Sequence, residues 1–174
     1  MKLRYAILAI LLLCLITGCE GPITGIVVDA ETGKPIEGAV ILVEWTIVKG
    51  LPGLTHTESY KVVEVVTDKD GKASITGVAN PLVDPPRVTV YKKGFVAWNN
   101  EFIFPDWKKR TDFKWLNNYV FKLEKFRPDY SYDKHQDFVS FSISVGASAQ
   151  KKQMFNAIRW EELKAVEERS NKTK

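Results

Sequence analysis

Short segments of β-type sequence, each bounded by turn residues, recur between residues 23 and 123 and constrain the fold more than any other feature. In residues 39–45 the pattern is clearest, because Ala39, Ile41, Val43 and Trp45 fall on one face at a period of two. By the same criteria we predict strands over residues 23–29, 39–45, 60–67, 72–76, 87–92 and 119–123, with further β-rich sequence over 95–98 and 101–104. Short strands at such regular spacing are typical of a β-sandwich or barrel.

The segments between the predicted strands contain the residues that turns require. The turn expected over residues 30–35 contains a glycine and a proline, and that over 68–71 opens with aspartate and closes with glycine. Gly50, Pro52 and Gly53 form a third such group, and we expect a loop there between the second and third strands.

Four segments of the chain resemble the signatures of the carboxypeptidase regulatory-like domain: residues 25–29, 32–39, 67–73 and 93–95. The resemblance implies a mainly β fold, a Greek-key, prealbumin-like β-sandwich of about seven strands, which we assign to residues 19–125. The resemblance implies no catalytic residue and no cofactor. In carboxypeptidases this is an accessory domain, and a separate zinc domain carries out the catalysis. Related domains serve as adhesion, carbohydrate-binding or assembly modules.

The first nineteen residues have the composition of an export signal. Lys2 and Arg4 give a positive start, and the uncharged run from residue 5 to 16 is shorter than the roughly 20 residues that a transmembrane helix needs. The run ends in Ile16-Thr17-Gly18-Cys19, which resembles the bacterial lipobox. The alternatives are an ordinary signal peptide with a chance cysteine, or an uncleaved anchor.

The lipobox resemblance implies that residues 1–18 are removed by cleavage between Gly18 and Cys19, and that Cys19 becomes lipidated. We therefore expect a lipid-anchored domain outside the cytoplasm, on the cell membrane or the outer membrane. Glu20 replaces the aspartate that retains enterobacterial lipoproteins in the inner membrane, which favours the outer membrane where there are two. Several acyl chains would hold the protein there durably.

The mature composition excludes several classes of function. Without Lys2 and Arg4 the chain has 23 basic and 21 acidic residues, a net charge of +2 that gives no general attraction to nucleic acid. Cys14 leaves with the signal and Cys19 is used for lipid, so the domain must be stable without a disulfide. We expect a protein partner in the envelope rather than nucleic acid.

Few residues are candidates for catalysis or for binding a metal. His56 and His135 are the two histidines of the chain; neither lies in a zinc motif, and we interpret both as solvated. The glutamate pairs 161–162 and 167–168 are expected on an exposed helix face, as a solvated surface. The sequence therefore predicts no enzyme, no metal site and no cofactor.

Residues 126–174 are predicted to form a C-terminal helical hairpin. Residues 134–145 are ambiguous: Val139, Phe141, Ile143 and Val145 alternate with serines as in a strand, yet a helix capped by Ser131 or Asp133 and ended at Gly146 is favoured. Residues 149–169, after the candidate cap Ser148, have helical periodicity, with one apolar face made of Met154, Phe155, Ile158, Ala165 and Val166.

The insert at residues 98–118 is longer and more aromatic than a plain sandwich loop. Its aromatic and basic residues are the candidates for binding: Trp98, Trp107, Lys108, Lys109, Arg110 and Trp115. We expect a lipid-anchored, non-enzymatic interaction or structural module of the cell envelope. The alternative is a carbohydrate-binding module that uses the aromatics of this insert, and packing of the tryptophans on the sandwich stays open.

Overall fold

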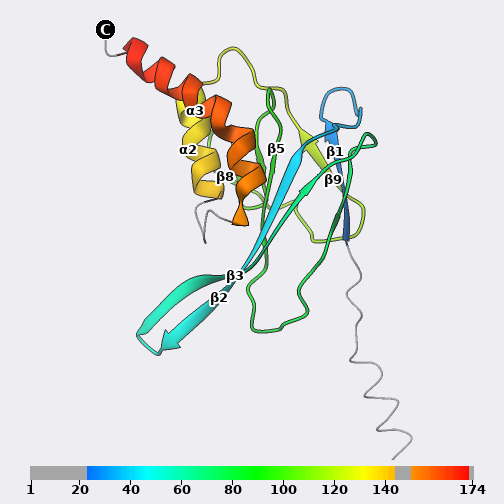
Figure 1. Cartoon of the computed structure of the whole chain (residues 1–174), viewed down its shortest axis with the longest axis vertical. Coiled ribbons are helices and arrows are strands. Elements are labelled where there is room, and N and C mark those ends of the chain that lie inside the picture. The colour runs from blue at the N-terminus through cyan, green and yellow to red at the C-terminus, as the bar shows by residue number, and fades with distance from the viewer. Residues whose placement is uncertain (1–22, 144–149, 173–174) are drawn as a thin grey trace, which may run out of the picture.

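Seven strands form two β-sheets in the computed structural model, which describes residues 23–143 and 150–172 (Figure 1). The first sheet has the order β4-β1-β9 and contains β1 (Ile23–Asp29), β4 (Lys72–Ile75) and β9 (Tyr119–Leu123). The second has the order β3-β2-β5-β6 and contains β2 (Val40–Leu51), β3 (Leu54–Val66), β5 (Arg87–Tyr91) and β6 (Trp98–Asn99). Two shorter strands pair separately, β7 (Phe102–Ile103) and β8 (Lys108–Lys109).

The main core lies between the two sheets, because each sheet buries the apolar side chains of one face. Its residues from the first sheet include Val27, Ile75, Phe121 and Leu123. The second sheet contributes Ile41, Val43 and Trp45 of β2, Val88 and Val90 of β5, and Trp98 of β6. The face predicted for residues 39–45 is therefore confirmed.

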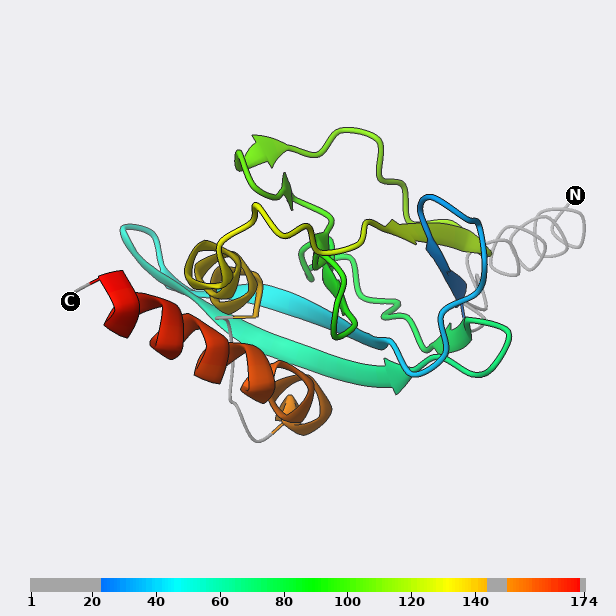
Figure 2. The same ribbon diagram turned by 90° about the horizontal axis from the view of Figure 1, so that it is seen from above.

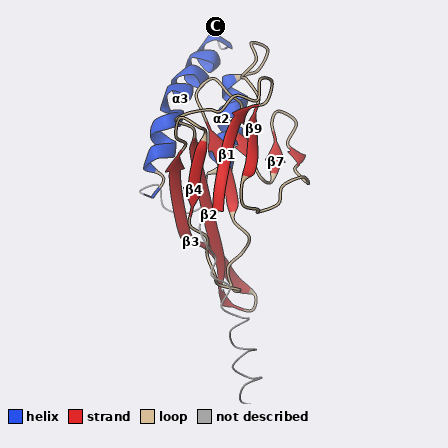
Figure 3. Cartoon of the chain, turned by 90° about the vertical axis from the view of Figure 1, so that its right-hand side faces the viewer, coloured by secondary structure: helices blue, strands red, loops and turns tan. Residues whose placement is uncertain are grey.

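Two helices, α2 (Tyr132–Ser142) and α3 (Lys152–Lys172), cover the other face of the second sheet. Figure 3 shows them on one side of the strands, and Figure 2 shows α3 running alongside β3 and β2. A second core joins them to the sheet: Val40 and Leu42 of β2 and Tyr91 of β5 pack with Phe138, Val139, Met154 and Ile158 of the helices. The expected Greek-key β-sandwich of about seven strands with a C-terminal helical hairpin is confirmed.

The ambiguous segment is a helix, since α2 runs from Tyr132 to Ser142. Ser131 is its N-cap, as expected, and the Oγ atom accepts a hydrogen bond from the amide of Lys134. Gly146 and Ser148, the expected helix end and the next cap, lie outside the described residues. On α3, Met154, Ile158 and Ala165 are buried, but Val166 is 56% exposed, so that part of the predicted apolar face is wrong.

The loop predicted between the second and third strands is wrong, because β2 and β3 continue as a hairpin through residues 46–59. The pairing runs from Thr46 opposite Ser59 to Leu51 opposite Leu54, so only Pro52 and Gly53 connect the strands. Gly53 has a φ of 85°, which suits a tight connection. We call residues 46–59 the β2–β3 arm; Figures 1 and 3 show that it projects from the body of the domain.

Candidate functional site

The first candidate binding residue, Trp98, lies in the main core rather than on the surface. The side chain is 5% exposed, and its ring meets Phe113, Tyr119 and Phe121 edge-on or tilted at centroid distances of 5.4, 5.9 and 4.9 Å. This packing follows from the position of β6 at the edge of the second sheet, where the ring is directed toward β9. Trp98 consequently offers no free ring face on which a sugar could stack.

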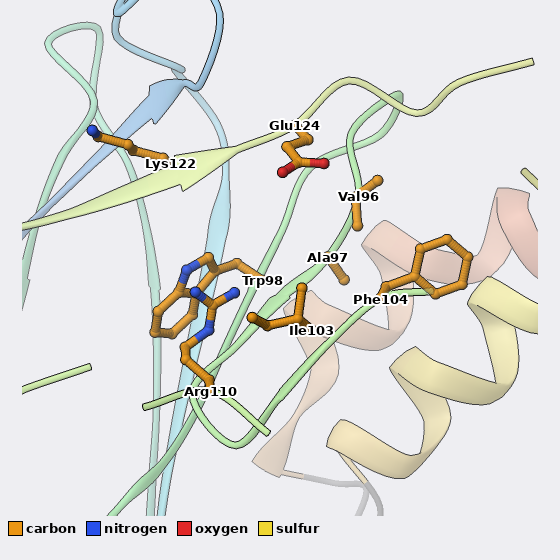
Figure 4. A pocket seen from close by; sticks show the side chains of 8 residues that line it. All are labelled: Val96, Ala97, Trp98, Ile103, Phe104, Arg110, Lys122 and Glu124. Carbon is orange, nitrogen blue, oxygen red and sulfur yellow. The ribbon is translucent and has the colours of Figure 1, made fainter. Parts of the chain in front are cut away.

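Arg110 covers the remaining face of Trp98. The guanidinium carbon lies 4.5 Å from the Trp98 ring centroid, a cation–π contact, and Nε donates a hydrogen bond of 2.7 Å to the carbonyl of Asn99 (Figure 4). The same guanidinium forms an ion pair with Asp112 at 3.3 Å. Arg110 is thus held in place by three contacts, and its charge is partly neutralised.

Trp107, Lys108 and Lys109 form the exposed part of the insert. Trp107 adopts a left-handed backbone conformation, with a φ of 56°, which directs its ring toward helix α2. The ring packs edge-on against Phe138 and Phe141 at 5.2 and 5.3 Å and remains 40% exposed. The two lysines of β8 are exposed beside it, so this tryptophan and the lysine pair form the surface most accessible to a ligand.

Trp115 lies at a different place, against Trp45 of β2. Their rings meet edge-on at 6.2 Å, and Trp115 is half-buried. Both rings, with Val78, Asn80 and Pro85, line a pocket of about 230 Å³. The six candidates are therefore not gathered on one surface: Trp98 and Arg110 form a closed stack, Trp107 with the lysine pair faces solvent near α2, and Trp115 packs near the loop that follows β4.

Beside the Trp98–Arg110 stack lies a small cavity with about 30 Å³ of free space, room for about one water molecule (Figure 4). A wider groove of about 510 Å³ continues from it along β9. Arg110 and Lys122 line this groove together with Asp112 and Glu124, so its cations and carboxylates balance one another. Its lining also includes Tyr119, which is partly exposed.

Sequence reasoning missed a buried polar network under the helices. His135 is fully buried, so its interpretation as a solvated histidine is wrong. The Nε2 atom accepts a hydrogen bond of 2.8 Å from the amide of Ala97, which places the ring proton on Nδ1, and Nδ1 donates to Glu161. Both ring nitrogens are occupied by protein partners, so His135 joins α2 and α3 to the segment before β6.

Glu161 is also buried, at 2% exposure, which corrects the prediction of a solvated glutamate pair at 161–162. The second carboxylate oxygen accepts a hydrogen bond of 2.7 Å from the hydroxyl of Tyr91, and that hydroxyl accepts one of 2.8 Å from Trp160 Nε1. Burial, followed by the nearby Glu161 charge, raises the pKa of Tyr91 far above its ordinary value, so the hydroxyl stays protonated.

A second buried ion pair fixes the start of α3. Lys151 is fully buried, and Nζ donates hydrogen bonds of 2.8 Å to Glu44 Oε2 on β2 and to the carbonyl of Ile143. The amides of Gln153 and Met154 at the beginning of α3 donate to the carboxylate of Glu64 on β3. These contacts lock the helical hairpin to the second sheet.

The buried groups do not form a reactive centre. His135 resembles a general base because a glutamate orients it, but Nε2, the atom that would take a proton, is bonded to a backbone amide inside the core. Within residues 23–143 and 150–172, no three histidine, cysteine, aspartate or glutamate side chains are grouped as metal ligands would be. The network has the features of a structural one, in which every nitrogen and oxygen of His135 and Glu161 has a partner.

Gly18 and Cys19, the expected cleavage and lipidation sites, precede the described residues, so both assignments remain predictions. Among the described helices, none combines the length and hydrophobicity that a membrane crossing requires.

Neither a protein family nor a curated protein matches the chain. Solved structures with a similar fold include the C-terminal domain of the shaft pilin SpaA from Lactobacillus rhamnosus GG, at 18% identity and a TM-score of 0.36, covering 61% of this chain and 98% of that domain. A longer SpaA structure has the same identity and TM-score, with 62% and 50% covered. A streptococcal ancillary pilin is 19% identical, with a TM-score of 0.31 and coverages of 62% and 30%. The likeness to these proteins is one of fold alone.

Proposed function

We propose that the protein is a lipid-anchored, non-enzymatic interaction or structural module of the cell envelope. One observation carries the proposal: the lipobox-like sequence ending at Cys19 is followed, four residues later, by the first strand of the sandwich at Ile23. A lipid on Cys19 would be attached almost directly to β1, a central strand bonded to β4 on one side and to β9 on the other. The anchor and the folded domain would thus form one unit without a long linker.

The arrangement of polar groups supports a binding or structural role. Three groups able to do acid–base chemistry, His135, Glu161 and Tyr91, are bonded to one another inside the second core. The exposed candidates, Trp107 with Lys108 and Lys109, instead suit recognition by charge and surface contact. An envelope protein is the partner that this proposal favours.

Lipidation is tested by growing cells with an alkyne-tagged fatty acid and measuring tag on the purified protein. We expect label on the wild type and on Cys14→Ala, since Cys14 lies within the removed signal, and no label on Cys19→Ala. Unlabelled wild type, or equal label on Cys19→Ala, would refute the anchor. Crosslinking in intact cells followed by gentle extraction tests the partner: a protein that is monodisperse and uncrosslinked would contradict an interaction module.

A carbohydrate-binding module is the alternative, and the exposure of Trp107 favours it. The half-exposed ring beside two lysines could stack on a sugar and hold an anionic group. Titration with cell-wall glycans should then change tryptophan fluorescence in the wild type and not in Trp107→Ala. Trp115→Phe serves as the control, because Trp115 lies against Trp45, away from the lysine pair.

A further inference from the structure

Three segments meet at the end of the sandwich where β1 begins, which we call the N-terminal pole. The pairing of Ile23 with Ile75 directs residues 76–83 to this end, and the pairing of Gly25 with Tyr119 directs residues 113–118 there. The amide of Thr24 donates to Asn117 Oδ1 at 2.8 Å, which fixes the second loop beside the start of β1.

The β2–β3 arm projects from the same end (Figures 1 and 3). Its root is joined to the loop that follows β4, because the Thr46 carbonyl accepts a hydrogen bond of 2.9 Å from the Asp84 amide and the Thr46 hydroxyl donates to the Asp84 carboxylate at 3.1 Å. The arm root therefore lies at the N-terminal pole, and the arm tip, residues 50–55, lies at the same end of the long axis but to the side of the two loops (Figures 1 and 2).

Exposed leucines are concentrated at this pole. Leu51 and Leu54 at the arm tip are 73% and 79% exposed, Leu82 on the loop after β4 is 76% exposed, and Leu116 before β9 is 58% exposed. In the described part of the chain, only one other leucine, Leu163 on α3, is comparably exposed. Isolated apolar side chains on a surface are ordinary, but four leucines on three segments at one end indicate a contact surface.

Charged residues, unlike exposed leucines, are rare in the segments at this pole. Among residues 50–55, 76–83 and 113–118, the one charged side chain is that of Lys114. The turns at the other end, residues 30–35, 68–72 and 124–129, contain ten charged residues. The leucine-bearing end is thus less charged than the other end, although the Lys61 ammonium donates to the carbonyls of Thr76 and Gly77 there and Lys49 pairs with Glu58 on the arm.

The position of the proposed anchor indicates which surface the N-terminal pole contacts. Four residue steps separate Cys19 from Ile23, and an extended chain covers at most about 14 Å in four steps. Acyl chains on Cys19 would therefore hold the N-terminal pole against the lipid interface. There leucine side chains gain free energy by leaving water.

We infer that the N-terminal pole is a second, lipid-contacting site: the leucines of the two loops beside the anchor, and those of the arm tip farther to the side, insert into the membrane interface. This inference rests on the proposed lipid anchor at Cys19. The occupant is a lipid surface, and the sandwich would then stand with β1 directed away from the membrane and its charged end exposed to partners.

Environment-sensitive labelling of the acylated, full-length mature protein tests the contact. Because Cys19 is the single cysteine of the mature chain and would carry lipid, Leu54→Cys provides one thiol for a nitrobenzoxadiazole probe. In vesicles of phosphatidylcholine and phosphatidylglycerol, we expect a blue-shifted emission that headgroup-proximal spin-labelled lipid quenches. The matched control, Lys69→Cys in the turn at the charged end, should show neither effect. An unshifted probe at residue 54, or a shift without vesicles that rises with protein concentration, overturns the inference.

Vesicle flotation of the unacylated Cys19→Ala protein separates this site from the anchor. Leu51→Asp and Leu54→Asp should each lower the vesicle partition coefficient about tenfold, because burial of one leucine is worth about that factor. Leu163→Asp on α3 should leave the coefficient unchanged. If Leu51→Asp and Leu54→Asp partition into vesicles as strongly as Leu163→Asp, the lipid-contacting pole is refuted. This conclusion holds even where fatty-acid labelling has established the anchor. Loss of labelling at Cys19 alongside leucine-dependent partitioning would refute the anchor alone.

Discussion

Replacing Lys151 by methionine should destabilise the domain strongly, because the change leaves a buried carboxylate without its cation. In the described part of the chain, Lys151 is the hydrogen-bond partner of Glu44 Oε2, and Glu44 Oε1 has none. Removing one member of a buried pair costs about 3–5 kcal/mol, and the total stability of a domain is about 5–15 kcal/mol. The variant also loses the bond from Nζ to the Ile143 carbonyl. We expect a loss of about 4 kcal/mol.

The double variant Glu44→Leu/Lys151→Met tests the origin of that cost. Replacement of both charges by apolar side chains removes the unpaired carboxylate, so the double variant should lie within about 1 kcal/mol of wild type. The coupling energy between the two positions would then be at least about 2 kcal/mol. Lys164→Met is the matched control: its ion pair with Glu167 has the same distance, 2.8 Å, but both side chains are more than half exposed. That change should cost less than about 1 kcal/mol.

Urea unfolding of the Cys19→Ala protein, followed by tryptophan fluorescence, measures these free energies. The m-values of the variants must match that of wild type for the comparison to hold. A cost below about 1 kcal/mol for Lys151→Met, or a double variant as unstable as the sum of the single ones, would refute the reasoning.

Three further predictions follow from single contacts. The bonds that Lys172, Ser131 and the Asp133 amide make to Glu168 lower the pKa of its carboxyl group from 4.5 to about 2. Ionised Glu168 therefore stabilises the fold by about 1 kcal/mol after solvent screening; this contribution is complete above pH 4.5 and disappears as the pH falls toward 2. Glu168→Gln should flatten this acid dependence in urea titrations. Gly71→Ala should cost more than about 2 kcal/mol by thermal unfolding, because φ is 70° and the new Cβ would lie 2.4 Å from the Val27 carbonyl oxygen. Trp98→Ala should cost about 3–5 kcal/mol in chemical denaturation, as expected for a buried ring at the centre of the main core; a loss below 1 kcal/mol would contradict that placement.

The alternation of apolar residues was sufficient to predict the strands of the main core. Residues 39–45 illustrate why: a period of two, set by backbone geometry, marks the buried face before any partner is known. The arm was missed for a local reason. Glycines and a proline at positions 50–53 indicate a loop, yet the same residues form a two-residue hairpin connection when β-branched residues flank them on both sides.

The errors at His135 and Glu161 have a different cause. Polar residues on a helix are expected to face solvent, and the partners that make burial favourable here are distant in sequence: Ala97 and Tyr91 belong to the sandwich. A single sequence contains no signal for such pairings. The same holds for Trp98 and Arg110, because neither residue type nor spacing reveals that the guanidinium covers the indole ring.

The neighbouring positions of β1 and β9 have a mechanical consequence. A force applied at the residue before Ile23 would act along β1, whose backbone is hydrogen-bonded to β4 on one edge and to β9 on the other. The load would be borne by both rows of bonds in shear, so they would resist together rather than separate one after another. A domain held by its amino terminus against flow or traction would in this way transmit the strain to the middle of its first sheet, and not to a peripheral strand that peels away.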